Sequence, residues 1–408
     1  MLVSFLNDDM KYILSNIIAV VSAAMIFSSC GPQKNLYKWE RDEIRPIADA
    51  AICYGGHSAR NPYLWTEERF EKTVLYKDEN GQEHWLFDNM ILMELWDDDY
   101  AVTYSIANDG RYSSRKEHWL RQLDYWFDQE NGLNALDECI ADAARRIGNP
   151  PSKRGIIFSL PDPVYFEHYT KAMKGENRNT VYWGELDGVA LDFSKTEDRI
   201  KAYLWLVDQV RARFAQAGYK YVELIGFYVL SEELSVPGGF RYEYKEHDKT
   251  IKAVADYCHS LNEGLYWVPY AMAPGIEYCK DFGFDLAVMQ PNYYWTDARW
   301  SWDQIEKKIR DHNLGMELEL EGTHGEPLTS SILSYLKNGQ PNPYSERNKG
   351  RFLEYLDNAQ ARGLYGEVPF VLYAGTNGLY ELAVSRDEKD MEIYHKLCKF
   401  VVGNPLKK

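Results

Sequence analysis

The chain of 408 residues lacks an excess of basic side chains. It carries 46 lysines and arginines against 62 aspartates and glutamates, which gives a net charge of −16 at pH 7. A surface that binds a phosphate backbone needs a basic footprint, so nucleic acid is not an expected partner. Beyond the N-terminal region the sequence also lacks an apolar run long enough to span a bilayer.

Cysteine is scarce, and its spacing follows no ligand pattern. Five cysteines lie beyond the N-terminal region, without a C-x-x-C pair or a Cys/His cluster. This argues against a disulfide framework and a structural zinc site, so no metal or other cofactor is expected. One disulfide is the alternative to five buried thiols. The G-x-S-x-G signature of many serine hydrolases is absent too. The five are Cys53, Cys139, Cys258, Cys279 and Cys398.

Aromatic side chains with polar tips are what the sequence has in excess. It contains 12 tryptophans and 31 tyrosines, more than the packing of a core requires. Such rings offer an apolar face and a hydrogen-bonding group at once. Part of this excess is therefore expected at a binding surface.

The N-terminal region resembles a bacterial secretion signal. Lys11 precedes an apolar run, and the block from Phe27 to Gly31 is similar to a lipobox. The similarity implies cleavage before Cys30 and a lipid on its sulfur. Two aspartates just ahead of Met10 are out of place in a positively charged leader. Translation is therefore expected to begin at Met10, with residues 1–9 a mis-assigned start.

The expected N-terminal organisation is a signal peptide over residues 1–29 and a lipid-anchored tether over residues 30–46. A single-pass anchor or a buried helix is the alternative for the apolar run. The residues after Cys30 carry no acidic cluster, which favours the periplasmic side of the outer membrane over the cell surface. The cell envelope is thus the expected location, with the membrane as a partner through the anchor.

Residues 47–408 show short apolar runs that alternate with helical periodicity, the pattern of parallel βα units. Eight such strands predict a single α/β domain, a (β/α)8 TIM-type barrel with long loops at its C-terminal face. The predicted strands are Ile47–Tyr54, Trp85–Leu95, Gly155–Leu160, Tyr221–Tyr228, Leu265–Tyr270, Asp285–Gln290, Gly315–Leu320 and Pro369–Ala374. The predicted helices are Arg115–Phe127, Leu133–Ile147, Glu197–Ala217, Ile251–Leu261, Ser301–His312, Ser345–Ala361 and a closing helix at Glu388–Val402. The Asp187-Gly188 pair predicts a hairpin over Trp183–Phe193 rather than a ninth barrel strand.

The seventh predicted strand carries alternating glutamates. Period-two alternation places Glu317, Glu319 and Glu321 on one face and apolar residues on the other, so the three carboxylates are expected to face the barrel axis. Glu317 lies about 13 Å deeper than Glu321. It is expected to pair with a buried cation or hold a neighbour, whereas the upper two can meet a ligand. An antiparallel edge strand with a solvated charged face is the alternative.

Paired carboxylates across a cleft suit glycoside hydrolysis, in which one group is protonated and the other ionised. Glu232, after the fourth strand, is the expected acid and base, and Glu319 is the expected nucleophile, with Glu321 as its substitute. In a barrel these residues lie at the carboxyl ends of strands, where reactive groups gather.

Aromatic and amide side chains cluster where the predicted strands end. Rings beside amides suit sugars, which present a flat apolar face and a rim of hydroxyls. The expected sugar-binding residues are Tyr54, Trp96, Tyr228, Trp267, Tyr270, Gln290, Asn292, Tyr293 and Tyr373.

Several ordered motifs resemble a known family. They are Leu186–Gly188, Leu191–Ser194, Gly226–Tyr228, Ser231-Glu232, Trp267–Tyr270, Gly283–Asp285, Gln290–Tyr293 and Gly315–Glu319. In this order they are similar to the domain-of-unknown-function family 4855 of bacterial lipoproteins and secreted proteins, over residues 46–376. The resemblance implies a glycosidase-like barrel without an established catalytic pair. The residues that match its motifs are Glu232, Gln290, Asn292, Glu317 and Glu319.

The sequence therefore predicts a carbohydrate-active lipoprotein, with an oligo- or polysaccharide as ligand and a pair of glutamates for glycoside hydrolysis. The alternative is a glycan-binding lipoprotein that uses the same scaffold without catalysis. That protein would have the aromatic cleft but no opposed carboxylate pair, or a pair neutralised by a salt bridge.

Overall fold

The computed structural model describes residues 37–56, 64–97, 102–105, 112–163, 181–234, 246–295, 300–321 and 346–407. The predicted signal peptide, the lipidation site Cys30 and the first part of the tether lie outside these residues. Among the described residues, no helix combines the length and the apolar character needed to cross a membrane.

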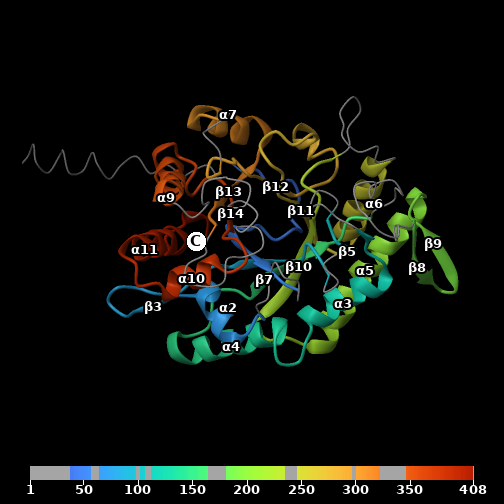
Figure 1. The fold of residues 1–408 in the computed structure, drawn as a ribbon, viewed down its shortest axis with the longest axis horizontal. Coiled ribbons are helices and arrows are strands. Elements are labelled where there is room, and N and C mark those ends of the chain that lie inside the picture. The colour runs from blue at the N-terminus through green and yellow to red at the C-terminus, as the bar shows by residue number, and fades with distance from the viewer. Residues whose placement is uncertain are drawn as a thin grey trace, which may run out of the picture.

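Eight parallel strands close into a barrel, as the sequence predicts. Around the ring they follow the order β1-β14-β13-β12-β11-β10-β7-β4. Helices surround the strands on the outside (Figure 1). The barrel strands are β1 Asp49–Tyr54, β4 Asn89–Met93, β7 Arg154–Leu160, β10 Val222–Val229, β11 Gly264–Trp267, β12 Leu286–Met289, β13 Gly315–Glu319 and β14 Phe370–Tyr373.

All seven predicted helices are present within a few residues of their predicted bounds. They are α3 Lys116–Trp126, α4 Gly132–Ile147, α5 Thr196–Ala217, α6 His247–Ser260, α7 Trp302–His312, α9 Glu346–Ala361 and α11 Glu388–Val402. Two shorter helices were not predicted, α2 Glu67–Val74 and α10 Gly378–Val384. Helix α2 begins at a residue type that is typical of helix N-termini. The Thr66 side chain accepts a hydrogen bond from the Arg69 backbone N–H and caps the helix.

One predicted strand merges two elements. The run from Trp85 to Leu95 contains the end of a small hairpin, β2 Leu75–Lys77 with β3 Glu83–Trp85, and then the barrel strand β4. The chain breaks between them at Asp88, whose backbone N–H donates to the Asp49 side chain at 2.8 Å. A continuous apolar run does not mark such a break, so the sequence alone placed the start of the strand too early.

The predicted hairpin is confirmed outside the barrel. Strands β8 Tyr182–Leu186 and β9 Val189–Asp192 pair antiparallel and project from the body of the molecule (Figure 1). Asp187 and Gly188, with φ of 51° and 77°, form the turn between them. Both residues adopt the left-handed conformation, which Asp-Gly pairs accept readily in two-residue hairpin loops. A third small pair, β5 Val102–Thr103 with β6 Tyr112–Ser113, lies after β4.

Strand β13 is a barrel strand whose glutamates are buried. It pairs in parallel with both β12 and β14, so the edge-strand alternative is wrong. Glu317, Glu319 and Glu321 are 3%, 1% and 7% exposed, and the alternating apolar residues are buried as well. The outward set packs under the helices, and the carboxylates occupy the inner face. The five cysteines are unpaired and buried, so the disulfide alternative is wrong as well.

A strap of residues before β1 closes the amino-terminal end of the barrel. The Tyr37 backbone N–H donates to Glu367 O at 2.9 Å, just before β14. Asn313, just before β13, exchanges two hydrogen bonds of 2.9 Å with the Lys38 backbone. Further along, Arg45 reaches Glu223 at the start of β10, at 2.6 Å. The strap thus crosses the amino ends of most strands before the chain enters the barrel.

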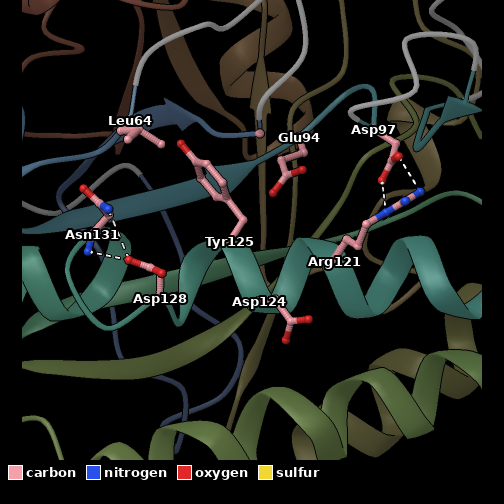
Figure 2. Close-up of a pocket in the computed structure, with 9 residues that line it drawn as sticks. Leu64, Glu94, Asp97, Arg121, Asp124, Tyr125, Asp128 and Asn131 are labelled. Atoms are coloured by element: carbon pink, nitrogen blue, oxygen red, sulfur yellow. Dashed lines mark hydrogen bonds and ion pairs between the residues drawn. The ribbon is translucent and has the colours of Figure 1, made fainter.

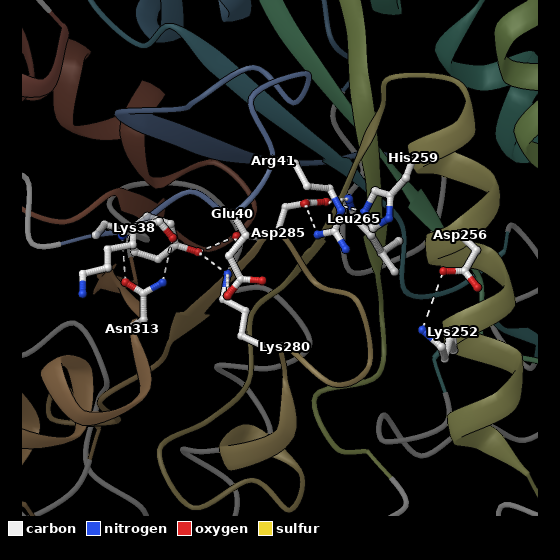
Figure 3. A network of polar contacts seen from close by, with 11 residues as sticks. Lys38, Glu40, Arg41, Lys252, Asp256, His259, Leu265, Lys280, Asp285 and Asn313 are labelled. Carbon is white, nitrogen blue, oxygen red and sulfur yellow. Dashed lines mark hydrogen bonds and ion pairs between the residues drawn. The ribbon is translucent and has the colours of Figure 1, made fainter.

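Asp285 is the centre of the polar network that holds this strap (Figure 3). Its side chain is buried and accepts from Arg41 Nη1 at 3.0 Å, from the Leu265 backbone N–H at 2.9 Å and pairs with His259 Nε2 at 2.9 Å. Its backbone carbonyl accepts from the Tyr37 hydroxyl and from Lys280 Nζ. One carboxylate therefore ties the strap to β11, β12 and α6.

The C-terminal segment covers the same end. Asn404 Nδ2 donates to Ala48 O at 3.3 Å, and Lys407 Nζ lies 2.7 Å from Asp49 Oδ2. Both segments therefore lie across the amino end of the barrel, opposite the carboxyl ends of the strands.

We expect Asp285→Ala to lower the free energy of unfolding by about 3 kcal/mol, because it leaves the half-buried Arg41 and His259 without their carboxylate and the buried Leu265 N–H unsatisfied. Urea unfolding of the wild type and the variant measures the loss. The control is Asp311→Ala, which removes an exposed i,i+4 pair with Lys307 on α7 and should cost less than about 0.5 kcal/mol. Equal effects of the two substitutions would show that the Asp285 network does not hold the strap.

Candidate functional site

One loop at the carboxyl end of the barrel forms hydrogen bonds with two predicted catalytic carboxylates. Glu319 is the last residue of β13, and Glu232 lies in the segment after β10. Between these strands in the ring lie β11 and β12, and the chain after β12 runs Gln290-Pro291-Asn292. Gln290 Nε2 donates to Glu232 Oε1 at 3.2 Å, and Asn292 Nδ2 donates to Glu319 Oε1 at 3.3 Å. A single three-residue segment therefore positions both carboxylates.

Glu319 accepts hydrogen bonds on both carboxylate oxygens. Asn292 occupies Oε1, and the Tyr355 hydroxyl from α9 donates to Oε2. Asn292 has a φ of 54°, a left-handed conformation that asparagine tolerates better than most residues, and this conformation turns the loop back over β13. Both oxygens act as acceptors, the pattern of an ionised carboxylate.

The contacts of the Tyr355 hydroxyl fix the direction in which it donates its hydrogen bond. Its oxygen accepts the backbone N–H groups of Tyr293 at 3.1 Å and Tyr294 at 3.3 Å. Burial and the charge of Glu319 raise the pKa of Tyr355 well above its ordinary value, so it stays protonated. Its hydroxyl is thus fixed as a donor to Glu319.

Burial nevertheless makes the anion of Glu319 costly. Burial, together with the charge of Glu232, raises the pKa of Glu319 to about 7. The hydrogen bonds from Tyr355 and from the backbone of Asn292 and Tyr293 act in the opposite direction. Glu319 is therefore poised to change its protonation near neutral pH.

Glu317, two residues before Glu319 on the inner face of β13, lies deeper in the barrel and stays protonated. Burial, followed by the charges of Glu319 and Glu232, raises its pKa well above the ordinary value. In the described part of the chain no lysine, arginine or histidine forms an ion pair with it, so the predicted cation partner is not found there. The deeper glutamate is kept in the barrel as a protonated acid, because a second adjacent anion would be unfavourable.

Two further glutamates lie at the rim. The Tyr270 hydroxyl donates to Glu233 Oε1, and the Tyr373 hydroxyl donates to Glu321 Oε2 at 2.8 Å. Glu321, the predicted substitute nucleophile, thus accepts a hydrogen bond from Tyr373. Glu233 was not among the predicted catalytic residues, and only its position beside Glu232 could have indicated it.

Tyrosines from several strands line the space near these carboxylates. Burial raises the pKa of Tyr228 well above its ordinary value, and the charges of Glu232 and Glu317 and the hydroxyl of Tyr54 raise it further, which places these groups close together. The rings of Tyr54 and Tyr373 meet edge to face, with centroids 6.0 Å apart. Tyr270 and Tyr373 are half-buried and remain partly accessible. Four predicted rings thus lie near the carboxylates at the carboxyl end of the barrel.

Two predicted sugar-binding rings have other roles. Trp267 is fully buried, its indole N–H donates to Ser231 O at 2.6 Å, and its ring stacks on Phe284 at 5.3 Å. Its neighbour Tyr266 takes the inward position on β11, so Trp267 points outward into the packing under the helices. The prediction that Trp267 binds sugar is wrong, because the sequence did not show which residues of β11 face the barrel axis.

Tyr293 packs toward the helices as well. Its hydroxyl donates to Glu354 of α9, and its ring lies 5.0 Å from that of Trp302 on α7. Its backbone N–H, not its ring, serves the site through Tyr355. Trp96 is half-buried after β4 and forms a bridge to Thr103, on the opposite side of the ring from β12.

The family model "Domain of unknown function (DUF4855)" matches residues 49–399. The chain belongs to this family. The resemblance predicted from the ordered motifs is thereby confirmed, and the match covers the whole barrel of this DUF4855 member. No curated protein matches the chain.

Solved structures similar to this DUF4855 chain are barrels of low sequence identity. A Group IV chitinase from Ostrinia furnacalis has 8% identity and a TM-score of 0.42, with 85% of this chain and 99% of that chain covered. A GH113 beta-1,4-mannanase has 10% identity, a TM-score of 0.41 and coverage of 86% and 98%. A tryptophan synthase alpha-subunit from Pyrococcus furiosus has 9% identity, a TM-score of 0.34 and coverage of 89% and 98%. At this level the likeness is one of barrel architecture, and nothing about the site is taken from it.

Two residues of the DUF4855 site were not predicted from the sequence. Tyr355 lies on α9, 36 positions after Glu319, and no local pattern distinguishes it from other buried tyrosines. Trp295 belongs to the aromatic cluster after β12, and its ring lies 6.1 Å from that of Tyr373. The cluster was recognised, but its individual side chains could not be assigned. Among the described residues there is no group of three or more histidine, cysteine, aspartate or glutamate side chains that could hold a metal ion.

The raised pKa of Glu319 predicts a pH-dependent stability. The folded protein retains this proton above the ordinary value of 4.5, so the stabilisation is complete below about pH 4.5 and is lost as the pH rises through about 7. Between pH 5 and 8, the wild type should lose on the order of 2 kcal/mol more unfolding free energy than Glu319→Gln, which has no proton to lose. Urea unfolding at both pH values measures this difference. Parallel pH curves for the two proteins would contradict the assignment.

Proposed function

We propose that this protein is a glycoside hydrolase in which Glu319 is the nucleophile and Glu232 is the general acid and base. The observation that carries the proposal is the segment Gln290–Asn292, which donates a hydrogen bond to each of the two carboxylates. Glycoside hydrolysis needs two carboxyl groups held on opposite sides of the bond that is cleaved.

The environments of the two groups favour different roles. Glu319 accepts hydrogen bonds on both oxygens, and these favour its anion above the pKa of about 7. Glu232 is half-buried and lies beyond the end of its strand, where it can reach the oxygen of a leaving group. The nucleophile needs a fixed anion, and the acid needs access to exchange its proton.

The reaction follows in two steps. Glu319 attacks the anomeric carbon while Glu232 transfers its proton to the glycosidic oxygen, so the C–O bond breaks and the leaving sugar departs with that proton. Glu232, now ionised, takes a proton from water, and the resulting hydroxide attacks the same carbon and releases Glu319. The Tyr355 hydroxyl holds Glu319 during both steps and supplies no proton.

Half-buried rings and amides around the mouth would bind the sugar. Tyr270 and Tyr373 expose part of their rings beside the rim glutamates, and Gln290 and Asn292 lie between the two catalytic groups. Tyr54 and Tyr228 contribute hydroxyl groups from the floor. Rings that combine apolar faces with fixed polar tips are suited to a carbohydrate ligand.

We expect Glu319→Gln and Glu232→Gln each to lower the release of reducing sugar from a glycan panel by about 10²–10⁴-fold. The matched control is Glu223→Gln, which changes a glutamate at the amino end of the same strand, β10, and should leave activity unchanged. If the wild type binds glycans without releasing sugar, the non-catalytic glycan-binding alternative is favoured. Activity that survives Glu319→Gln would rule out Glu319 as the nucleophile.

We further propose that the protein is held in the bacterial cell envelope by a lipid on Cys30, on the periplasmic side of the outer membrane. Support comes from the lipobox-like block at residues 27–31 and from the position of the strap, which docks on the amino-terminal end of the barrel at Tyr37. An anchor at that end would leave the mouth, at the opposite end, open to a glycan.

Cys30→Ser should move the protein from the membrane fraction to the soluble fraction, because lipid attachment needs the thiol. Fractionation of expressing cells, with mass spectrometry of the N-terminal peptide, measures the change. The control is Cys53→Ser, whose thiol is buried in β1 and should not affect the partition. Membrane retention of Cys30→Ser would contradict the lipid anchor.

A further inference from the structure

The side chain of Gln290 connects three neighbouring strands at the carboxyl end of the barrel. Gln290 follows β12, Val268 follows β11 and Glu232 follows β10, in the order in which these strands lie in the ring. Gln290 Nε2 lies 2.9 Å from Val268 O and 3.2 Å from Glu232 Oε1. One amide nitrogen therefore reaches across β11 to the proposed acid and base.

The backbone of Gln290 is fixed to the same neighbouring segment. Its N–H donates to Pro269 O at 2.8 Å, and Gln290 pairs with Tyr270 in a parallel bridge. Backbone and side chain are thus both hydrogen-bonded to the residues that follow β11. These contacts restrict the rotation of the amide away from Glu232.

The contact with Val268 determines which way the amide faces. A backbone carbonyl oxygen can only accept a hydrogen bond, so the nitrogen of the amide, and not its oxygen, must face Val268 O. The same nitrogen is then the atom that faces Glu232. Its two protons are used by Val268 and Glu232, which leaves Oε1 of Gln290 to meet a sugar.

Acidic side chains lie around Glu232. Carboxylates that ionise close to one another disfavour a further anion, whereas a hydrogen-bond donor favours it. The Gln290 N–H therefore acts against the acidic neighbours of Glu232 and stabilises its anion. The described titratable groups near Glu232 are Tyr228 on β10, Glu233 beside it with the Tyr270 hydroxyl that donates to Glu233, and Glu317 and Glu319 on β13.

We propose that Gln290 is a positioning residue that acts through Glu232 and favours its ionised form. A hydrogen bond to a carboxylate is stronger than one to a neutral acid, so the amide assists the transfer of the Glu232 proton to the glycosidic oxygen. Gln290 then holds the resulting carboxylate for the water of the second step. This role rests on the proposed function and extends it, because it assigns Gln290 to both steps.

The test follows the protonation of Glu232 without turnover. The protein is prepared with glutamate that carries ¹³C in its side-chain carboxyl group, and the resonance of Glu232 is identified by its absence in Glu232→Gln. Its chemical shift is then measured as a function of pH. Gln290→Met removes the donor at a similar side-chain size, and Gln290→Lys replaces the neutral donor with a positively charged one.

The matched control is a second amide that donates to a carboxylate. Asn131 Nδ2 donates to Asp128 Oδ1 at 3.1 Å at the turn between α3 and α4 (Figure 2). Asn131→Ala removes this donor in the same way and should leave the titration of Glu232 unchanged.

We expect Gln290→Met to raise the pH at which Glu232 titrates by about 1 pH unit, because the anion loses a charge-assisted hydrogen bond. Gln290→Lys should lower it below the wild-type value, because it adds a positive charge. A purely structural role would not reverse the sign between the two variants. The unfolding midpoint of each variant checks its fold, and if Gln290→Met does not fold, Gln290→Lys still tests the sign.

No change in either variant, or a shift in the same direction in both, would overturn the role of Gln290. The alkaline limb of kcat/KM reports the same proton, so it should move up in Gln290→Met and down in Gln290→Lys. If the Glu232 titration moves as expected but the wild type hydrolyses no glycan, the hydrolase fails and the effect of Gln290 on Glu232 stands. If the wild type hydrolyses glycans through Glu232 and the titration does not move, the role of Gln290 fails and the proposed function stands.

Discussion

The burial of glutamates inside a closed parallel barrel is the constraint on which the rest of the site depends. Strand β13 presents Glu317 and Glu319 on its inner face, where water cannot solvate two adjacent negative charges. The two carboxyl groups therefore have different environments. Glu317 is kept protonated, and Glu319 receives a hydrogen-bond donor on each oxygen. The arrangement of the loop after β12 and of Tyr355 on α9 follows from the need to stabilise one anion.

The amino end of the barrel contributes to stability, and the carboxyl end carries the proposed catalytic groups. At the amino end, the strap is held by an ion pair to the buried carboxylate of Asp285 and the C-terminal segment by an ion pair to the buried carboxylate of Asp49. At the carboxyl end, amide and tyrosine side chains donate hydrogen bonds to the carboxylates, and the pKa of Glu319 is raised to about 7. Buried ion pairs are costly to break, so they suit the closed end, and the open end can carry groups that are unfavourable for stability.

The fold was largely predictable from the sequence, and the site only in part. Alternation between strand and helix patterns gave all eight strands, and period-two alternation gave the inward face of β13. The same reasoning failed for Trp267, because a four-residue apolar strand such as β11 does not reveal which residues face inward. Tyr355 could not be found, because its contact with Glu319 depends on how α9 packs on the barrel. Gln290 and Asn292 were placed correctly near the mouth, but their role as donors to the two carboxylates required the geometry.

The central claim is that Glu319 forms a bond to the sugar. It is tested most directly by incubating the protein with a panel of 2-deoxy-2-fluoroglycosides that carry good leaving groups, followed by peptide mass spectrometry. These reagents slow the second step of a retaining hydrolase more than they slow the first, so the glycosyl group remains on the nucleophile. The account predicts a sugar adduct on Glu319. An adduct on Glu232 or Glu321, or glycan hydrolysis that proceeds with inversion and leaves no adduct, would contradict it.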